Sequence, residues 1–294
     1  MFRKMASIIL RFTLIPFFIR EFIQRKKVTI IYYHDIKPET ADKHFKALSS
    51  KYNIISLKDY IKSKKLGKVD KLPHKSLIIT FDDGFKNNHK LKPILEKYKI
   101  PVTIFLCTGI VGTRRHFWWK NIIDKNMRES LKNIPDEKRL EILKKFDFEE
   151  KKEFKDRQSL SKSEIEEMKN VVDFQSHTMF HPILTKCSTE RVYKEISQSK
   201  IDLENNYGLR VYGLSYPNGN CSDREISIAK EMGYECGLTV DLGFNSQDTD
   251  LFRLKRIHID DDVDTNELLV RVSGLLGYII RFGKIWNGQL ISED

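Results

Sequence analysis

Short apolar runs rich in β-branched residues alternate along the chain with longer stretches in which apolar residues recur at helical spacing. The runs predict strands near residues 28–33, 77–82, 102–107, 171–176, 211–216, 236–240 and 254–259. Helices are predicted between them, at 41–50, 57–64, 88–98, 189–206, 222–232 and 265–280. Because strands that alternate with helices usually pair in parallel, we expect an α/β fold and, from the strand count, a barrel of seven or eight strands.

One long stretch interrupts this alternation. Between residues 120 and 170, basic and acidic side chains occur in nearly equal number and the strand pattern is absent. Such mixed charge is typical of solvated helices, so we predict a charged helical insertion at about 113–168 over one face of the barrel. Trp118 and Trp119 lie near its start as a candidate substrate platform. On a local strand the two rings would point to opposite sides, one into the core and one toward a sugar ring.

The 294-residue chain is 40% hydrophobic and has a formal charge of +11. This length buries a large core, which excludes a disulfide-stapled miniprotein and a disordered chain. The excess charge is concentrated at the ends: residues 1–27 hold seven Lys and Arg against Glu21 alone, and residues 268–292 hold three basic residues and no acid. Without a basic stripe on the central domain, nucleic acid is not an expected partner. The four cysteines lack metal-site spacing and are expected to be reduced thiols.

The basic N-terminal segment is also apolar. Lys4, Ser7 and Arg11 share one helical face and apolar residues fill most of the rest, which is typical of an amphipathic helix at a membrane interface. Arg11, Pro16 and Arg20 interrupt the apolar run, so a transmembrane span is not predicted, and no small-x-small cleavage site follows it. We therefore expect this segment to contact an anionic membrane surface.

These features divide the chain into an N-terminal segment at 1–27, a barrel domain at 28–264, and a C-terminal amphipathic helix and tail at 265–294. Two arrangements suit the C-terminal helix: packing on the domain with a polar outer face, or contact with the membrane. We expect peripheral attachment at the cytoplasmic face; if the segment did span a membrane, the three positive charges that follow the first apolar stretch, against two that precede it, would also keep the domain cytoplasmic. The alternative is an N-terminal anchor with the domain outside the cytoplasm.

Acidic residues and histidines follow two of the predicted strands. Asp82 and Asp83 come at the end of the strand at 77–82, and Gly84 then allows a tight turn. His177 and His181 follow the next-but-one strand, four residues apart, so that on a helical turn both rings share a face. Barrel enzymes keep catalytic groups at this end of their strands, and two histidines with a carboxylate can form a three-ligand metal site. The alternative for the aspartates is an acidic helix N-cap.

These motifs resemble those of a known family. Thr-Phe-Asp-Asp-Gly at 80–84 and Ser-His-Thr-Met-Phe-His-Pro at 176–182 resemble the first two motifs of the polysaccharide deacetylases, carbohydrate esterase family four, which includes the chitooligosaccharide deacetylases. Tyr-Pro-Asn-Gly at 216–219 is similar to the family's Pro-Tyr-Gly loop. Tyr-Tyr-His-Asp at 32–35 resembles the N-terminal motif of the permuted subgroup, the poly-β-1,6-N-acetylglucosamine deacetylases. The resemblance covers roughly residues 28–260.

The resemblance implies a distorted (β/α) barrel that holds one divalent metal, most commonly zinc. Carried over by position, the metal ligands are Asp83, His177 and His181. Asp82 would be the general base that takes a proton as water attacks the acetamide, while the metal polarises the carbonyl. For the general acid the permuted subgroup implies His34, and His258 is the alternative because it lies near the place of the late Leu-x-His motif of other members.

The loop and one arginine depart from the family pattern. Tyr216, Pro217 and Asn218 would contact the substrate or stabilise an oxyanion, but Asn218 replaces an aromatic residue. The family's base-orienting arginine has no equivalent before this loop, and Arg253 or Arg256 is the candidate substitute. The expected function is removal of N-acetyl groups from amino sugars of a polysaccharide or lipid-linked glycan. The alternatives are a related deformylase or amidohydrolase, and a catalytically silent glycan-binding module.

Overall fold

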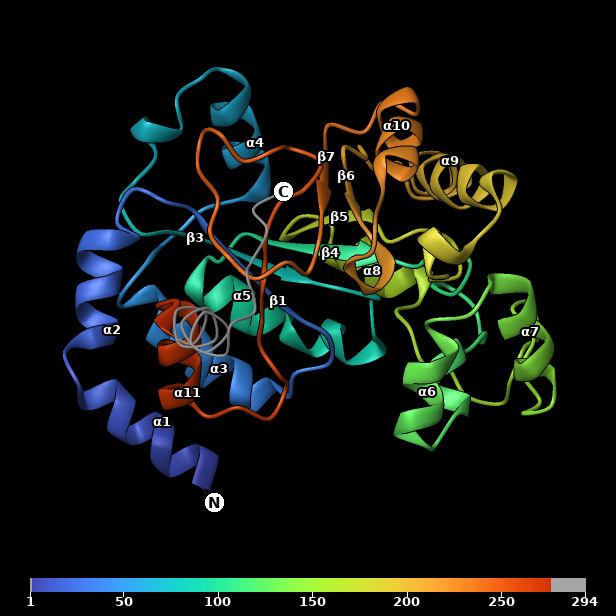
Figure 1. The fold of residues 1–294 in the computed structure, drawn as a ribbon, viewed down its shortest axis with the longest axis horizontal. Coiled ribbons are helices and arrows are strands. Elements are labelled where there is room, and N and C mark those ends of the chain that lie inside the picture. Colours follow the sequence, from blue (N-terminus) through green and yellow to red (C-terminus); the bar gives the residue numbers. More distant parts are fainter. Residues whose placement is uncertain (1, 276–294) are drawn as a thin grey trace, which may run out of the picture.

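The computed structural model describes residues 2–275, so the predicted end of the last helix and the tail that follows lie outside the described residues. One sheet of parallel strands forms the centre of the fold (Figure 1). Its strands are β1 (Thr29–Tyr33), β2 (Asn53–Ile54), β3 (Ser76–Phe81), β4 (Val102–Leu106), β5 (Val172–Ser176), β6 (Gly213–Ser215), β7 (Cys236–Leu238) and β8 (Ile257–His258). They are arranged in the order β7-β6-β5-β4-β3-β1-β8, with β2 beside β3.

The sheet curls because one segment touches both of its edges. Leu254 pairs with Leu238 of β7, and four residues later His258 of β8 pairs with Tyr32 of β1. The predicted distorted (β/α) barrel of seven or eight strands is thereby confirmed. Only β2 was not predicted, because a strand of two residues carries too short an apolar pattern to detect.

Helices cover the outside of the curled sheet. The α-helices are α1 (Phe2–Phe12), α2 (Ile15–Phe18), α3 (Pro38–Ser49), α4 (Leu57–Lys65), α5 (Lys92–Tyr98), α6 (Lys125–Leu131), α7 (Asp136–Lys144), α8 (Lys162–Met168), α9 (Thr189–Tyr207), α10 (Asp223–Glu231) and α11 (Thr265–Val272). A π-helix, η1 (Ile19–Ile23), and the 3-10 helices η2 (Val69–Lys71), η3 (Lys86–Leu91), η4 (Trp118–Asn121), η5 (Leu184–Lys186) and η6 (Pro217–Gly219) complete the elements.

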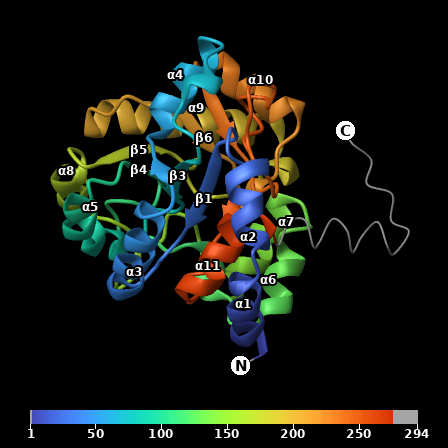
Figure 2. The ribbon, with the colours of Figure 1, turned by 90° about the vertical axis from the view of Figure 1, so that its left-hand side faces the viewer.

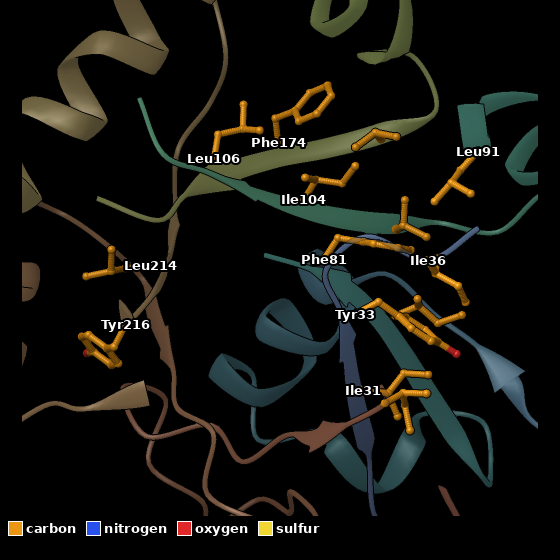
Figure 3. Packing of buried hydrophobic residues seen from close by; sticks show 14 of the residues in the cluster. Ile31, Tyr33, Ile36, Phe81, Leu91, Ile104, Leu106, Phe174, Leu214 and Tyr216 are labelled. Carbon is orange, nitrogen blue, oxygen red and sulfur yellow. The ribbon is translucent and has the colours of Figure 1, made fainter. Parts of the chain in front are cut away.

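The alternation of side chains along each strand positions the site. Residues on the outer face, such as Tyr33, Phe81 and Phe174, pack under the helices, and the Tyr33 and Phe81 rings stack at 5.4 Å (Figure 3). Residues between them face the barrel interior, where Ile30 and Ile78 belong to a second apolar cluster. Because strand side chains alternate with a period of two, the interior face ends in polar residues at the carboxyl edge of the sheet.

The insertion forms a small helical unit with its own core. Helices α6 and α7 stand on the opposite side of the molecule from α1 and α2 (Figure 1). The strand expected around Trp118 and Trp119 is wrong, because these residues begin the 3-10 helix η4. Trp118 packs into the apolar cluster of the insertion with Leu131 and Leu143.

Candidate active site

Two strands on either side of β4 deliver adjacent carboxylates and a histidine to one cleft. Asp82 and Asp83 leave the end of β3, and His177 leaves the end of β5. Both Asp83 and Gly84 have positive φ angles, and a Cβ at residue 84 would lie 2.5 Å from Leu106 Cδ2. Glycine is therefore required at this turn, as the sequence predicts. The surrounding cleft has a volume of about 520 Å³, in the range typical of small-molecule sites.

Asp82 is held in a fully buried ion pair. Both of its oxygens accept hydrogen bonds from Arg256 at 2.8 Å, and the Ser215 hydroxyl donates a further bond at 3.3 Å. Arg256 is itself completely buried over the Tyr32 ring, at 4.3 Å from its centroid. Burial raises the pKa of Asp82, but Arg256 and His177 more than offset this and hold the pKa well below its usual range. Asp82 is therefore ionised at neutral pH.

The arginine that orients Asp82 is thus Arg256, one of the two candidates. The other, Arg253, instead donates to the exposed Asp223 at 2.7 Å. Ser215 was not singled out from the sequence, although its place on the interior face of β6 puts it beside the same carboxylate.

Asp83, His177 and His181 converge on one point. One ligand atom from each lies within 4.8 Å of the others, and Asp83 Oδ1 is 3.6 Å from His177 Nε2 and 3.7 Å from His181 Nε2. Asp83 Oδ1 is buried and has no hydrogen-bond partner within residues 2–275. His177 Nδ1 donates to the Ser215 carbonyl at 2.7 Å. The ring proton is therefore on Nδ1, and Nε2 carries the electron pair that can bind a metal.

The charge balance of this triad suits a cation. Burial, and then the neighbouring Asp82, raise the pKa of Asp83 well above its usual value. Burial lowers the pKa of both His177 and His181, so that both rings are neutral at neutral pH. Neutral imidazoles, an orphaned carboxylate oxygen and a buried setting are the donor set that a divalent metal prefers, and the three residues fit such an ion.

A strained loop carries the two histidines. Thr178 and His181 both have positive φ angles, which cost about 1–3 kcal/mol each for residues other than glycine. The fully buried Glu195 on α9 accepts the backbone N–H groups of Met179 and Phe180 at 2.7 and 2.9 Å. Sequence reasoning missed Glu195, although an acidic residue on the apolar face of a predicted helix is a detectable signal.

Glu195 in turn connects the loop to the insertion. Arg191 lies 3.0 Å from Glu195 and also pairs with Glu150 of the insertion. Burial raises the pKa of Glu195 to about 7 against the opposing charge of Arg191. On the other side of the loop, Trp118 Nε1 donates to the His181 carbonyl at 3.2 Å.

Two further histidines face the cleft near Asp82. The His34 and His258 rings lie 5.4 Å apart, and both residues line the cleft. Burial lowers the pKa of His34 to about 4, although the Asp82 carboxylate opposes the shift. His258 is more exposed and lies 3.4 Å from Asp260, whose carboxylate partly offsets the lowering of its pKa by burial.

The substrate-contact residues expected from the sequence fall into two groups. Trp118, Trp119 and Asn218 line the cleft, and the Trp119 ring is 4.4 Å from that of His181. Trp118 is almost fully buried, so Trp119 offers the more accessible face. Tyr216 and Pro217 are buried in the core and their side chains do not line the cleft.

The fold and this cluster define a class: parallel α/β barrels that carry paired aspartates and two histidines at the carboxyl edge of the strands, where barrel enzymes have their active sites. The chain belongs to the polysaccharide deacetylase family, whose model matches residues 70–237, more than half of the sequence.

Curated relatives agree with this assignment, and solved structures share the fold. The poly-β-1,6-N-acetyl-D-glucosamine N-deacetylase of Staphylococcus epidermidis is 27% identical over 219 residues, which are 71% of this chain and 62% of that protein. The chain spans between about half and two thirds of the length of the curated relatives it matches first. The fold is similar to that of the Streptococcus pyogenes deacetylase PplD, with a TM-score of 0.63 and 23% identity over 84% of this chain and 98% of the other. IcaB from Ammonifex degensii gives a TM-score of 0.61 and 17% identity, with 84% and 97% covered.

Proposed function

We propose that this protein is a metal-dependent hydrolase that removes N-acetyl groups from amino sugars of a polysaccharide or lipid-linked glycan. The observation that carries the proposal is the pairing of an ionised, arginine-bound Asp82 with Asp83, whose Oδ1 has no hydrogen-bond partner among the described residues and lies beside His177 and His181. The family and the names of the relatives support the same reaction.

Each residue of the cleft has a role in this hydrolysis. Polarisation of the acetamide carbonyl and activation of water are the chemistry that a divalent metal, most commonly zinc, supplies at Asp83, His177 and His181. Asp82 accepts a proton from the attacking water, and its low pKa means that it holds this proton only briefly. We assign His34 as the group that relays this proton to the departing amine. Its ring is neutral before the reaction and lies in the cleft near Asp82, so it can take up the proton that Asp82 accepted from water and pass it to the amine nitrogen. Trp119 offers its ring face to the sugar.

The reaction is tested by measuring acetate release from N-acetylated amino-sugar oligomers with metal-loaded protein. Wild type should release acetate, and Asp82→Asn should lose turnover about 10²–10⁴-fold because the proton acceptor is removed. Asp70→Asn, a change of the same kind at an exposed position, serves as the control. Equal acetate release by Asp82→Asn and wild type would contradict the assignment of the base, and formate release alone would favour a deformylase.

We also propose that the N-terminal helices dock on an anionic membrane surface. Nine large apolar side chains of α1, α2, η1 and their junctions are 40–75% exposed, and together they form the N-terminal apolar surface: Ile8, Ile9, Phe12, Leu14, Ile15, Phe17, Phe18, Phe22 and Ile23. Helix α1 lies beside α11 (Figure 2), with Ser7 buried and Arg11 bonded to Asn266. The polar side of α1 is therefore occupied by protein, and its apolar side faces outward.

Charge favours lipid as the occupant of this surface. Arg25, Lys26 and Lys27 are exposed and follow it directly, and each basic residue near an anionic membrane contributes about 1 kcal/mol. Within residues 2–275, no helix is long and apolar enough to cross a membrane. Because the cytoplasmic leaflet is the anionic one, these basic residues favour the cytoplasmic face, and protease added to intact cells should leave the domain uncut.

Vesicle binding tests the docking proposal. Full-length protein should sediment with vesicles that contain anionic lipid and less with neutral vesicles. Phe12→Ser, Phe17→Ser and Phe22→Ser together should abolish sedimentation, whereas Leu66→Ser, Ile123→Ser and Phe146→Ser, also exposed apolar positions, should not. Unchanged sedimentation of the phenylalanine variant would refute lipid docking by this surface.

A further inference from the structure

The insertion places a row of basic side chains along one wall of the active-site cleft. Lys125, Arg128 and Lys132 follow the spacing i, i+3, i+7 along α6 and its C-terminal end, so they share one helical face. All three line the cleft, and Lys120 of η4 lines it as well. We call these four residues the basic wall.

Most of the basic wall has no acidic partner in the part of the chain that the structure describes. Lys132 pairs with Glu129 at 2.9 Å, whereas no ion pair to Lys120, Lys125 or Arg128 occurs within residues 2–275. Arg128 Nε is buried and lacks a hydrogen-bond acceptor in the same part of the chain. A buried donor without an acceptor is unfavourable, so an acceptor from a bound molecule would satisfy it.

Two of the acids that line the cleft are engaged with other groups. Asp260 binds Arg271 at 2.8 Å, and Asp261 accepts the backbone N–H groups of His34 and Asp35 at 3.3 and 3.1 Å. These acids belong to the strand-end segments, whereas the basic wall belongs to the insertion. On the insertion side, the one described acid that lines the cleft is Glu129, which pairs with Lys132. The cleft is thus polarised, with the unpaired positive charge on the insertion side.

We propose that the basic wall binds an anionic oxygen group, a phosphate or a carboxylate, carried by the N-acetylated glycan next to the acetamide that is cleaved. The proposal rests on the deacetylase function and specifies its substrate class. Arginine forms paired hydrogen bonds with phosphate or carboxylate, and flanking lysines add point charges. A neutral N-acetylated sugar would leave these groups without partners, so an anionic sugar should be preferred.

The test compares kcat/KM for acetate release from one N-acetylated amino sugar in three forms: neutral, phosphorylated, and linked to a uronic acid. Preference for either anionic form supports the proposal and identifies the source of the charge. In the variant Lys125→Gln, Arg128→Gln, Lys132→Gln, the ratio of kcat/KM for the anionic to the neutral form should fall about 10–100-fold, mainly through KM. The control variant Lys138→Gln, Lys144→Gln, Lys145→Gln removes equal charge from exposed positions of α7 and its end and should leave the ratio unchanged.

Binding is measured in parallel, so that failure of this proposal and failure of the deacetylase function are distinguished. Titration of the phosphorylated and neutral sugars into Asp82→Asn reports recognition without turnover. Tighter binding of the phosphorylated or uronic form, lost in the basic-wall variant, would support the anion site even if no wild-type acetate release were found. Equal affinity for the neutral and both anionic forms, or equal loss of affinity for all forms in the basic-wall variant, would overturn it.

Discussion

The two sides of the active site, one around Asp82 and the other around Asp83, surround these adjacent carboxylates with opposite kinds of groups. Asp82 is surrounded by donors: Arg256 binds both oxygens and Ser215 adds a third contact. Asp83, the next residue, has a buried oxygen with no donor within residues 2–275 and faces two neutral histidines. Their pKa values accordingly move apart, downward for Asp82 and upward for Asp83. Opposite shifts of neighbouring groups are typical of divided roles, and in the proposed reaction Asp82 keeps its charge for proton transfer while Asp83 holds a cation.

The two sides are also built differently. The Asp82 side depends on a buried ion pair between residues 174 positions apart in the chain. The Asp83 side depends on a strained loop between His177 and His181, which Glu195 holds through its backbone N–H groups. Disturbing the first side should affect proton transfer and stability, and disturbing the second should affect metal binding.

The largest effect is expected for proton transfer beside Asp82. His34→Gln should lower kcat by about 10²–10⁴-fold because the amine then departs without its proton donor. His258→Gln is the matched variant, and its loss should be smaller because His258 lies against Asp260 at the more exposed part of the cleft. Steady-state kinetics of acetate release checks both, and a larger loss for His258→Gln would reverse the assignment.

Arg256→Gln should destabilise the protein by about 3–5 kcal/mol, since it leaves Asp82 as a buried carboxylate without its partner. Urea unfolding measures this change. Adding Asp82→Asn to Arg256→Gln should restore part of the lost stability, because the unpaired charge is then absent. Additive destabilisation by the two substitutions would show that the ion pair does not couple them.

On the Asp83 side, Glu195→Gln should weaken metal binding about 10–100-fold. This is the usual effect of removing a residue that holds metal ligands in place. Both loop N–H groups donate to the same oxygen of Glu195, and a glutamine replaces this charged acceptor with a weaker neutral one and puts an NH2 group where the other oxygen faces Arg191. Titration of chelator-treated protein with zinc gives the affinity. Glu204→Gln, on the same helix but away from the loop, is the control, and equal affinity in both variants would exclude a role for Glu195.

The smallest effect concerns pH. The folded protein keeps the Asp83 proton above pH 4, where the unfolded chain has lost it, because the folded pKa is raised. This carboxyl therefore destabilises the metal-free fold increasingly as pH rises, and the cost levels off above the raised pKa. Asp83→Asn should remove this cost. Relative to wild type, its free energy of unfolding should therefore rise by about 1.4 kcal/mol per pH unit over that range. Unfolding in chelator at several pH values measures the gain, and a gain that shrinks with rising pH would contradict the raised pKa.

Local sequence patterns predicted most of the fold and the site residues that follow strand ends. Apolar runs located seven of the strands, and Asp82, Asp83 and His177 follow directly from strand ends. Their convergence could be expected because the carboxyl ends of parallel strands meet at one edge.

The contacts that support these residues were harder to predict because they join distant segments. Arg256 was one of two candidate arginines, and only the packing of β8 beside β1 separates it from Arg253. The side of α1 that faces the protein depends on α11, whose Asn266 lies 255 positions from Arg11. No pattern within the N-terminal segment carries that information.

The division of roles between the adjacent aspartates is tested most directly by measuring bound metal and acetate release together in Asp82→Asn and Asp83→Asn. Asp82→Asn should bind about one equivalent of zinc with nearly wild-type affinity and release little acetate. Asp83→Asn should lose both the zinc and the turnover at the same metal concentration. Zinc retained by Asp83→Asn but lost by Asp82→Asn would contradict the account.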